Sequence, residues 1–379
     1  MSTMARKGGI MKEYTIITIN PGSSSTKVGV YKGGKVILDK TVDHDTHEFD
    51  ECKTFADQEP IRTRRIMSIL EDAGIDMNTV DAISGRGVGV YSCEGGTYII
   101  DDAAFSHAQN DVAKINHPAT LGIVIAKKLG DRLGVPSFFV NPMSVDELCD
   151  EARMTGVKGL YRPSHGHPLN MKQVAIHHSK LQGKKYEDCN YVILHMGGGT
   201  SIAAHRMGRI VDSTRSGDGQ GVISPNRSGD LCIDDVINLM NQRHIDLEQV
   251  NMLASRKGGL VDLVGTDDVR KVKKMIADGD KFAELAYNAM IYTFIKWTAM
   301  MAGVLAGKVD GILMTGGLAY DEELVEKVKS HTEWIAPVFV YPGSFETEAL
   351  GAGVERVLSG EEVARIYSGK PVWNGFDFE

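Results

Sequence analysis

The sequence has few cysteines, and none of them are in paired spacing. Its thiols are Cys52, Cys93, Cys149, Cys189 and Cys232, with no CxxC motif among them. This pattern gives no support to a disulfide framework and is typical of reduced thiols, so we expect a cytoplasmic protein. No secretory signal is visible either, because residues 1–12 contain no apolar run. We interpret them as an N-terminal extension ahead of the first strand.

Several catalytic motifs are also absent. The chain contains no GxxxxGK[ST] phosphate loop, no HExxH, no Cys/His cluster and no GxSxG. These absences exclude the P-loop way of binding ATP and leave zinc peptidases and α/β-hydrolases without support. A long apolar run is lacking as well. Residues 282–306 come nearest, but Glu284, Asn288 and Lys296 interrupt them, so we predict a buried helix rather than a membrane span.

The chain has no excess of positive charge. Its formal net charge of −8 argues against nucleic acid or an anionic membrane as a partner. Phosphate ligands remain compatible with this charge, since local arginines and backbone N–H groups decide their binding. A chain of 379 residues with 42% hydrophobic composition is long enough for two domains.

What the sequence does contain is a repeat. Residues 14–34, YTIITINPGSSSTKVGVYKGG, and residues 189–209, CNYVILHMGGGTSIAAHRMGR, both indicate a strand, a small-residue turn and a second strand. An offset of about 175 positions places Asn20 on His195 and Thr26 on Ser201. Such turns leave backbone N–H groups free to converge on an anion. We therefore predict a duplicated domain that holds a polyphosphate, most naturally a nucleotide, between its copies.

Strands and helices alternate along both halves. Beyond the two hairpins, the predicted strands cover 35–42, 80–84, 136–140, 209–212, 309–314 and 338–341. The predicted helices cover 59–71, 102–112, 118–133, 171–181, 233–241, 267–278, 281–306, 321–331 and 346–358. The alternation indicates an α/β fold with mixed sheets. The apolar face of the helix over 282–306 also favours a homo-oligomer.

Glycine turns and basic residues are the remaining candidates for a site. Arg86 lies in SGRG and Arg227 in NRSGD, and an arginine fork can bind a carboxylate or neutralise a moving phosphoryl group. A salt bridge is the alternative for each. His195 is either a capped strand end or a phosphate contact, and Asn20 is either a turn former or a phosphate contact. Glu348 either complements a helix dipole or binds magnesium.

The order of the motifs resembles a known family. TINPGSSSTK (residues 18–27) and VILHMGGGTSIAAHRMG (residues 192–208) are similar to the two signatures of the acetate kinase family, within the sugar kinase/Hsp70/actin superfamily. GRGVGVYSCEGGTY, NHPATLG, SPNRSGDL and PVFVYPGSFETEAL resemble its butyrate kinase branch. The resemblance implies duplicated actin-like ATPase (ribonuclease H-like) domains with mixed sheets.

The same resemblance implies a reversible, Mg²⁺-assisted phosphoryl transfer between ATP and a short-chain carboxylate, which forms ADP and an acyl phosphate. Butyrate or a branched short-chain acid is the expected acceptor. The alternatives are acetate or propionate with the same fold, or a non-catalytic nucleotide-binding sensor. A carboxylate is already ionised at neutral pH, so such an enzyme needs no general base but must bring two anions together.

Site residues follow from the resemblance as well. The implied catalytic residues are Asn20, Arg86, His117, His167 and Arg227. Those implied to bind the nucleotide or its phosphates are Ser23, Ser24, Ser25, Lys27, His195, Gly197, Gly198, Gly199, Gly316 and Gly317. Glu348 is the implied Mg²⁺ ligand. Asn141 stands where acetate kinases have an aspartate, which leaves Asp146 as an alternative.

Two further questions stay open at this stage. Within SHGHPLN, His165 and Asn170 are alternatives to His167 as the second catalytic residue. For the domains, we predict an N-terminal domain over residues 13–178 and a nucleotide-binding C-terminal domain over residues 179–349. We expect the helix in the segment 350–379 to pack back on the N-terminal domain.

Overall fold

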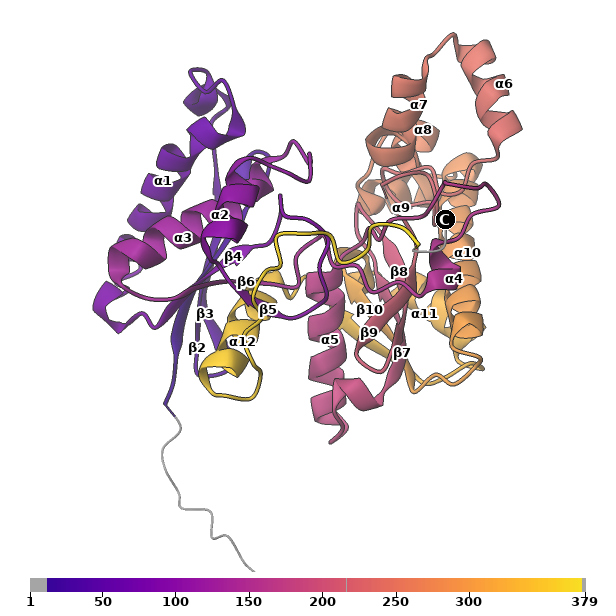
Figure 1. The fold of residues 1–379 in the computed structure, drawn as a ribbon. Helices are drawn as coiled ribbons and strands as arrows, with labels where there is room; N and C mark the ends of the chain where they lie inside the picture. Colours follow the sequence, from indigo (N-terminus) through magenta and orange to yellow (C-terminus); the bar gives the residue numbers. More distant parts are fainter. Residues whose placement is uncertain (1–11, 216, 377–379) are drawn as a thin grey trace, which may run out of the picture. The chain divides into compact units, whose positions relative to one another are not determined.

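The computed structural model describes residues 12–215 and 217–376 (Figure 1). Residues 1–11 of the predicted extension and residues 377–379 of the predicted C-terminal segment lie outside this part. The described chain forms two units. Unit 1 comprises residues 12–91, 96–140 and 347–370, and unit 2 comprises residues 92–95, 141–346 without 216, and 371–376. In this division residues 141–178 group with unit 2, and the domain boundary after residue 178 stays a prediction.

Unit 1 is built on a six-stranded mixed sheet in the order β3-β2-β1-β4-β6-β5. Its strands are β1 (Thr15–Pro21), β2 (Ser25–Lys32), β3 (Lys35–Asp43), β4 (Ala82–Arg86), β5 (Thr97–Ile99) and β6 (Ser137–Val140). β1, β2 and β3 form an antiparallel meander, whereas β1, β4 and β6 run parallel. The carboxyl ends of these three parallel strands therefore meet at one edge, the place where open α/β sheets commonly bind ligands.

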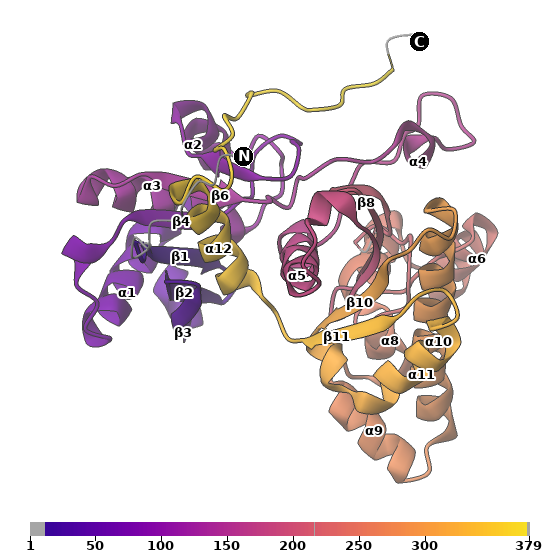
Figure 2. The same cartoon turned by 90° about the horizontal axis from the view of Figure 1, so that it is seen from below.

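Helices cover both faces of this sheet. They are α1 (Glu59–Asp72), α2 (Asp102–Gln109), α3 (Leu121–Leu133) and α12 (Glu346–Leu358), with 3₁₀ turns at Thr46–Phe49, Phe55–Gln58, Met77–Thr79 and Pro118–Thr120. α3 packs on β4, where a Cβ on Gly122 would lie 2.5 Å from the carbonyl oxygen of Arg86. On the other face, Ser84 donates a 2.9 Å hydrogen bond to the carbonyl of Leu350 in α12. Figure 2 shows α1 and α12 on opposite sides of the sheet.

Unit 2 repeats the strand arrangement with five strands in the order β11-β10-β7-β8-β9. These are β7 (Asn190–His195), β8 (Ser201–Arg206), β9 (Arg209–Ser213), β10 (Gly311–Gly316) and β11 (Val338–Pro342). β7, β8 and β9 are antiparallel, and β7, β10 and β11 are parallel, as β1 to β3 and β1, β4 and β6 are in unit 1. The predicted duplication is therefore confirmed.

The helices of unit 2 sandwich its sheet. They are α4 (Asp150–Arg153), α5 (Pro168–Leu181), α6 (Ile233–Arg243), α7 (Leu247–Met252), α8 (Leu260–Val264), α9 (Val269–Ala277), α10 (Lys281–Val304) and α11 (Glu322–Thr332), with short turns at Tyr186–Asp188, Leu253–Lys257 and Gly317–Tyr320. Along β7, Tyr191 and Ile193 pack on the α5 side, while Val192 and Leu194 pack on the α10 side. This period of two is that of a strand buried on both faces.

α10 is the central helix of the larger core. Met290, Phe294, Trp297 and Met301 are all buried, at the three- and four-residue spacing of one helical face. The prediction of a buried helix here is confirmed, and no helix in the described ranges is long and apolar enough to cross a bilayer.

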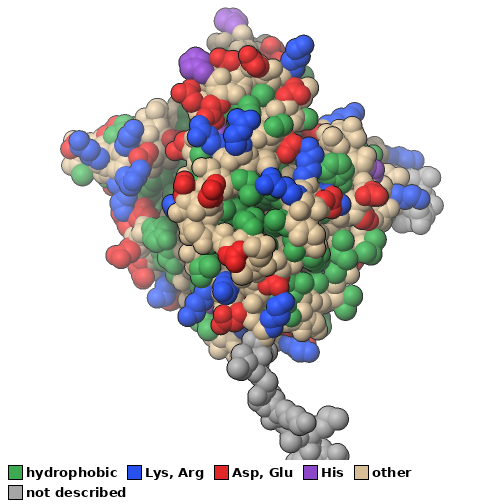
Figure 3. All heavy atoms as spheres, turned by 90° about the vertical axis from the view of Figure 1, so that its left-hand side faces the viewer, with side chains coloured by type: hydrophobic (Ala, Val, Ile, Leu, Met, Phe, Trp, Pro, Cys, Tyr) green, Lys and Arg blue, Asp and Glu red, His purple; other side chains and the backbone are tan. Residues whose placement is uncertain are grey.

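Acidic and basic side chains are interspersed on the face of the molecule seen in Figure 3.

The two hairpins differ by one residue in their turns. Pro21 pairs with Thr26 across residues 22–25, whereas His195 pairs with Ser201 across residues 196–200. When Thr26 is placed on Ser201, Pro21 rather than Asn20 falls on His195. The predicted matches of Asn20 with His195 and of Thr26 with Ser201 therefore cannot both hold in the paired strands, because the second turn holds one more residue.

Candidate active site

Three of the predicted residues lie at the carboxyl ends of neighbouring parallel strands. Asn20 is the last residue but one of β1, Arg86 ends β4, and Asn141 follows β6 directly. β4 lies between β1 and β6 in the sheet, so the strands bring these positions to the same edge. Asn141 has a φ of 38°, a left-handed conformation that asparagine tolerates better than most residues.

His117 is held against the first glycine turn. Its Nε2 lies 2.8 Å from Oγ of Ser23, and its Nδ1 accepts a 3.0 Å hydrogen bond from the backbone N–H of Ala119. Because Nδ1 is an acceptor, the proton of the neutral ring sits on Nε2 and is donated to Ser23. The structure thus brings together a predicted catalytic residue and a predicted phosphate-binding residue.

The other serines of this turn contribute their backbone. The carbonyl of Ser24 accepts a 2.8 Å hydrogen bond from the N–H of His44, and the carbonyl of Ser25 accepts one of 2.8 Å from the N–H of Gly22. These bonds fix the course of the turn while the hydroxyl of Ser23 is bonded to His117. The backbone carbonyls of the turn therefore hold its conformation through these two hydrogen bonds.

Lys27 and Glu348 lie near the start of α12. Lys27 forms a 3.0 Å ion pair with Asp39, which also accepts a 2.9 Å hydrogen bond from Oγ1 of Thr347. Burial, together with nearby carboxylates that include Glu348, raises the pKa of Tyr31 above its usual range. Lys27 is thus paired within unit 1, and its role in phosphate binding stays a prediction.

In unit 2, Asn170 of α5 connects the ends of two parallel strands. Its Nδ2 donates to Nδ1 of His195 at 2.8 Å and to Oγ1 of Thr315 at 3.2 Å, and its Oδ1 accepts from the N–H of Phe345 at 2.8 Å. Donation to Nδ1 places the proton of neutral His195 on Nε2. Sequence reasoning named Asn170 only as an alternative catalytic residue and missed this connecting role.

The second glycine turn lies against Arg227. A Cβ on Gly199 would be 2.7 Å from Nη1 of Arg227, so only glycine lets the guanidinium lie across the backbone. Nε of Arg227 donates to the carbonyl of Ser255 at 3.2 Å, but its buried Nη1 has no partner among the described residues. The same holds for Oδ1 of the preceding Asn226. Burial lowers the pKa of Arg227, which nevertheless remains charged at neutral pH.

His165 and His167 take different places in the same unit. The ring of His167 stacks on that of His195, with centroids 4.2 Å apart, and its Nδ1 is 2.9 Å from Oγ of Ser201. His165 faces Asp218 in the loop that precedes Arg227, with Nδ1 and Oδ2 3.4 Å apart. His167 thus adjoins the predicted site residue His195, and the choice of catalytic residue among His165, His167 and Asn170 stays open.

The turn after β10 presents bare backbone. Gly316 has a φ of 93°, and the backbone of Met196 leaves no room there for a Cβ. The N–H of Met196 donates to the carbonyl of Thr315 at 2.8 Å, which ties this turn to the end of β7. A Cβ built on Gly317 meets no atom within 4 Å. Such an open surface suits the adenosine side of a nucleotide, the role predicted for both glycines.

The described residues do not form a cluster of acidic side chains that would enclose a metal ion. Among the described residues, no group of three or more His, Cys, Asp or Glu could hold an ion. Asp146, the alternative ligand, is 5% exposed and forms a 2.7 Å ion pair with Arg153. The roles of Glu348 and the uncharged Asn141 as magnesium ligands stay predictions.

Comparisons with known proteins agree with these features. The sequence profile of the acetokinase family matches residues 161–335. Two proteins named probable butyrate kinase, from Clostridium botulinum strains Eklund 17B and Alaska E43, are 43% identical over 354 residues, which is 93% of this chain and 99% of each relative. The chain belongs to the acetokinase family.

Solved structures extend the likeness to the fold. Acetate kinase from Porphyromonas gingivalis matches with a TM-score of 0.76 at 19% identity, covering 91% of this chain and all of that one. A propionate kinase from Francisella tularensis matches with a TM-score of 0.70 at 15% identity, covering 89% and 98% of the two chains. Together with the repeated mixed sheets, these matches confirm the predicted duplicated actin-like fold.

Proposed function

We propose that the chain transfers a phosphoryl group reversibly between ATP and a short-chain carboxylate, forming ADP and an acyl phosphate. Membership of the acetokinase family supports this class of reaction. Butyrate, or a branched acid of similar length, is the proposed acceptor because the relatives at 43% identity bear the name probable butyrate kinase. A dimer or larger homo-oligomer is part of the same proposal.

The unsatisfied Nη1 of Arg227 is the single observation that carries the proposal. A buried guanidinium nitrogen without an acceptor is costly, and a bound anion would satisfy it. Gly199 lets this guanidinium lie along a glycine turn. The arrangement supports the presence of a phosphate or carboxylate oxygen at this place in the working enzyme.

The proposed chemistry is a direct displacement. A carboxylate oxygen attacks the γ-phosphorus of ATP, the bond from phosphorus to the β–γ bridging oxygen breaks, and ADP leaves with that oxygen. Arg86 and Arg227 are proposed to bind the carboxylate and the transferring phosphoryl group. His195 carries a donor proton on Nε2, His117 orders the hydroxyl of Ser23 through its own Nε2 proton, and Asn20 supplies an amide. These are fixed donors for negative charge, and no proton needs to move.

Magnesium fits this donor set, although the residues form no cage. Mg²⁺ keeps several waters and usually takes only one or two carboxylates, with substrate phosphates completing its shell. Glu348 is the proposed protein ligand, while Asn141 offers an uncharged amide oxygen. When bound, the ion would neutralise charge on the β- and γ-phosphates.

The proposal is tested by trapping the acyl phosphate with hydroxylamine. The purified chain is given Mg-ATP and acetate, propionate, butyrate, isobutyrate or valerate in turn, and the hydroxamate is measured. Arg86→Ala and Arg227→Ala are expected to lose about 10³-fold or more in rate, the scale of catalytic arginines in phosphoryl transfer. Arg243→Ala, which removes an exposed ion pair with Asp262, is the matched control and is expected to keep full activity.

Each pattern of products has one meaning. Preference for the four-carbon acids supports the proposed acceptor. Better turnover of acetate or propionate would keep the reaction but overturn the choice of acid. Absence of product with every acid, despite binding of ATP, would overturn the kinase proposal in favour of a nucleotide-binding sensor.

A further inference from the structure

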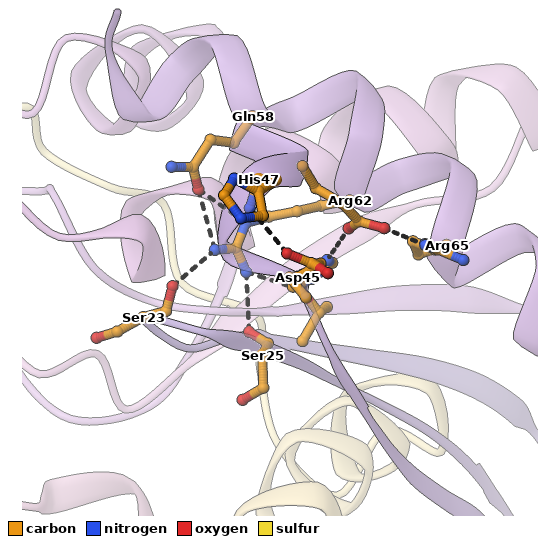
Figure 4. Close-up of polar contacts among 10 residues, drawn as sticks. Ser23, Ser25, Asp45, His47, Gln58, Arg62 and Arg65 are labelled. Carbon is orange, nitrogen blue, oxygen red and sulfur yellow. Dashed lines mark hydrogen bonds and ion pairs between the residues drawn. The ribbon is translucent and has the colours of Figure 1, made fainter. Parts of the chain in front are cut away.

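Arg62 lies fully buried beneath the first glycine turn, with 0% exposure. It projects from α1, and Figure 4 shows its guanidinium pointing at the backbone around Ser23 and Ser25. Nη1 donates to the carbonyl of Ser25 at 2.8 Å and Nη2 to that of Ser23 at 3.2 Å. The side chain thus grips the turn from the side of its carbonyls.

The remaining donors of Arg62 also reach uncharged acceptors. Nη1 donates to Oγ1 of Thr26 at 2.8 Å, while Nε and Nη2 donate to Oε1 of Gln58 at 3.1 and 3.0 Å. Its guanidinium further lies 4.9 Å from the ring centre of Phe49. Within the described ranges, no carboxylate forms an ion pair with Arg62.

This pattern is unusual, because buried charges are normally paired with an opposite charge. Glu48, a carboxylate of the same cluster, instead pairs with Arg65 and His44. Burial lowers the pKa of Arg62 to about 10, so the guanidinium still carries its proton at neutral pH. Unit 1 therefore keeps an uncompensated positive charge directly behind the turn.

The hydrogen bonds around His44 preserve that state. Nδ1 of His44 lies 3.1 Å from Glu48, and its Nε2 lies 2.8 Å from Oγ1 of Thr26. Since Thr26 accepts from Arg62, its hydroxyl proton is free to point to Nε2, which fits a neutral ring. Burial also lowers the pKa of His44, so no second cation arises next to Arg62 near neutral pH.

We propose that Arg62 is a positioning residue of the phosphate turn: it holds the carbonyls of Ser23 and Ser25, and its unpaired buried charge attracts the terminal phosphoryl group of ATP on the opposite side of the turn. This rests on the proposed function and on the phosphate role of residues 23–25. In this proposal Arg62 touches neither substrate. It acts by holding the turn in place and by the electrostatic attraction of its charge for the phosphoryl group.

Gln58→Glu tests the unpaired charge of Arg62 without removing the hydrogen bonds that Arg62 makes to the turn. Substitution of Arg62 itself would strip several carbonyls of their donor, and such a protein risks failing to fold. Gln58→Glu keeps an acceptor of the same shape for Arg62 and leaves its bonds to Ser23 and Ser25, but it pairs the guanidinium with a carboxylate. A carboxylate beside a buried arginine ionises readily, so the variant should fold at least as stably as the wild type.

The test compares how strongly the variant and the wild type bind ATP and ADP. Dissociation constants for Mg-ATP and Mg-ADP are measured by calorimetry, since only ATP carries the γ-phosphoryl group. We expect Gln58→Glu to weaken ATP about tenfold, the scale of one charge acting over several ångströms in a protein, with ADP unchanged. Gln109→Glu adds the same charge at an exposed position of unit 1 and is expected to bind both nucleotides like the wild type.

Two results would overturn the inference. One is a Gln58→Glu protein that binds ATP as tightly as the wild type, and the other is an equal loss for ATP and ADP, which would indicate general loosening. A lack of acyl phosphate formation by the wild type would instead speak against the proposed reaction. The comparison of nucleotides would still decide the role of Arg62.

Discussion

The imidazole rings of His167 and His195 stack face to face, with centroids 4.2 Å apart and planes within 16° of parallel. One ring comes from the residue just before α5 and the other from the end of β7. His195 is held from its edge by Asn170, so the stacking partner and the Nδ1 partner both come from the segment 167–170. The orientation of a predicted phosphate contact thus depends on two residues of SHGHPLN.

His167→Ala is expected to lower kcat/KM for acyl phosphate formation by about 10²-fold, because loss of the stacked ring frees His195 to move from its reacting position. Steady-state hydroxamate assays with varied ATP check this. His47→Ala, at a histidine whose side chain is 84% exposed, should leave the rate unchanged. A His167→Ala enzyme with wild-type kinetics would remove His167 from the site and leave His165 and Asn170 as the candidates.

His165→Ala is expected to raise the pKa of Asp218. The hydrogen bond from His165, with help from Arg215, lowers this pKa to about 2 from the ordinary 3.8. The depressed value stabilises the fold above pH 3.8, and the contribution is lost as the pH falls towards 2. Since the carboxylate is partly exposed, it is worth only on the order of 1 kcal/mol. Carbon-detected NMR titration of Asp218 measures the shift, and an unchanged midpoint would contradict it.

Gly199→Ala is expected to reduce activity far more than stability. The new methyl group would meet the guanidinium of Arg227 at 2.7 Å, and the flexible arginine would swing away rather than unfold the chain. We expect at least a tenfold loss in kcat/KM with a nearly unchanged melting temperature. Gly303→Ala, in α10 with nothing within 4 Å of the added methyl, is the control. Equal activity of the two variants would show that Arg227 need not lie over the turn.

Asn170→Ala is expected to destabilise unit 2. The substitution leaves the N–H of Phe345 and Oγ1 of Thr315 without their buried partner, at a cost of about 1–3 kcal/mol. Urea denaturation of the purified protein measures the change. Asn241→Ala, at an exposed position of α6, should change stability by less than about 0.5 kcal/mol. A loss below that limit for Asn170→Ala would contradict the connecting role.

Local patterns predicted much of the fold. The helix predicted over residues 346–358 has the bounds of α12, and that over 59–71 ends one residue before α1 does. Both have clear starts and an apolar face. The three-residue β5 was missed, because its pairing with β6 and with the backbone of Arg365 depends on residues far along the chain. The extra residue in the second turn was missed for a similar reason, since register shows only when strands are paired.

The candidate site was predicted less evenly. Glycine turns and nearby arginines are visible in the sequence, and His117 indeed contacts Ser23. Arg62, in contrast, sits in EPIRTRR among two other arginines, and nothing local distinguishes the buried one from its exposed neighbours. Its burial depends on how α1 docks against β2, which is a tertiary relationship.

The discontinuity of unit 1 has a consequence for biosynthesis. Its sheet is covered on one face by α12, and its edge strand is extended by Arg365, both from the range 347–370, whereas almost all of unit 2 comes from the continuous range 141–346. On the ribosome, unit 2 can acquire its core while unit 1 still lacks a layer. Nascent unit 1 therefore lacks the cover of this sheet face until α12 has been made, so its core can be completed only after that of unit 2.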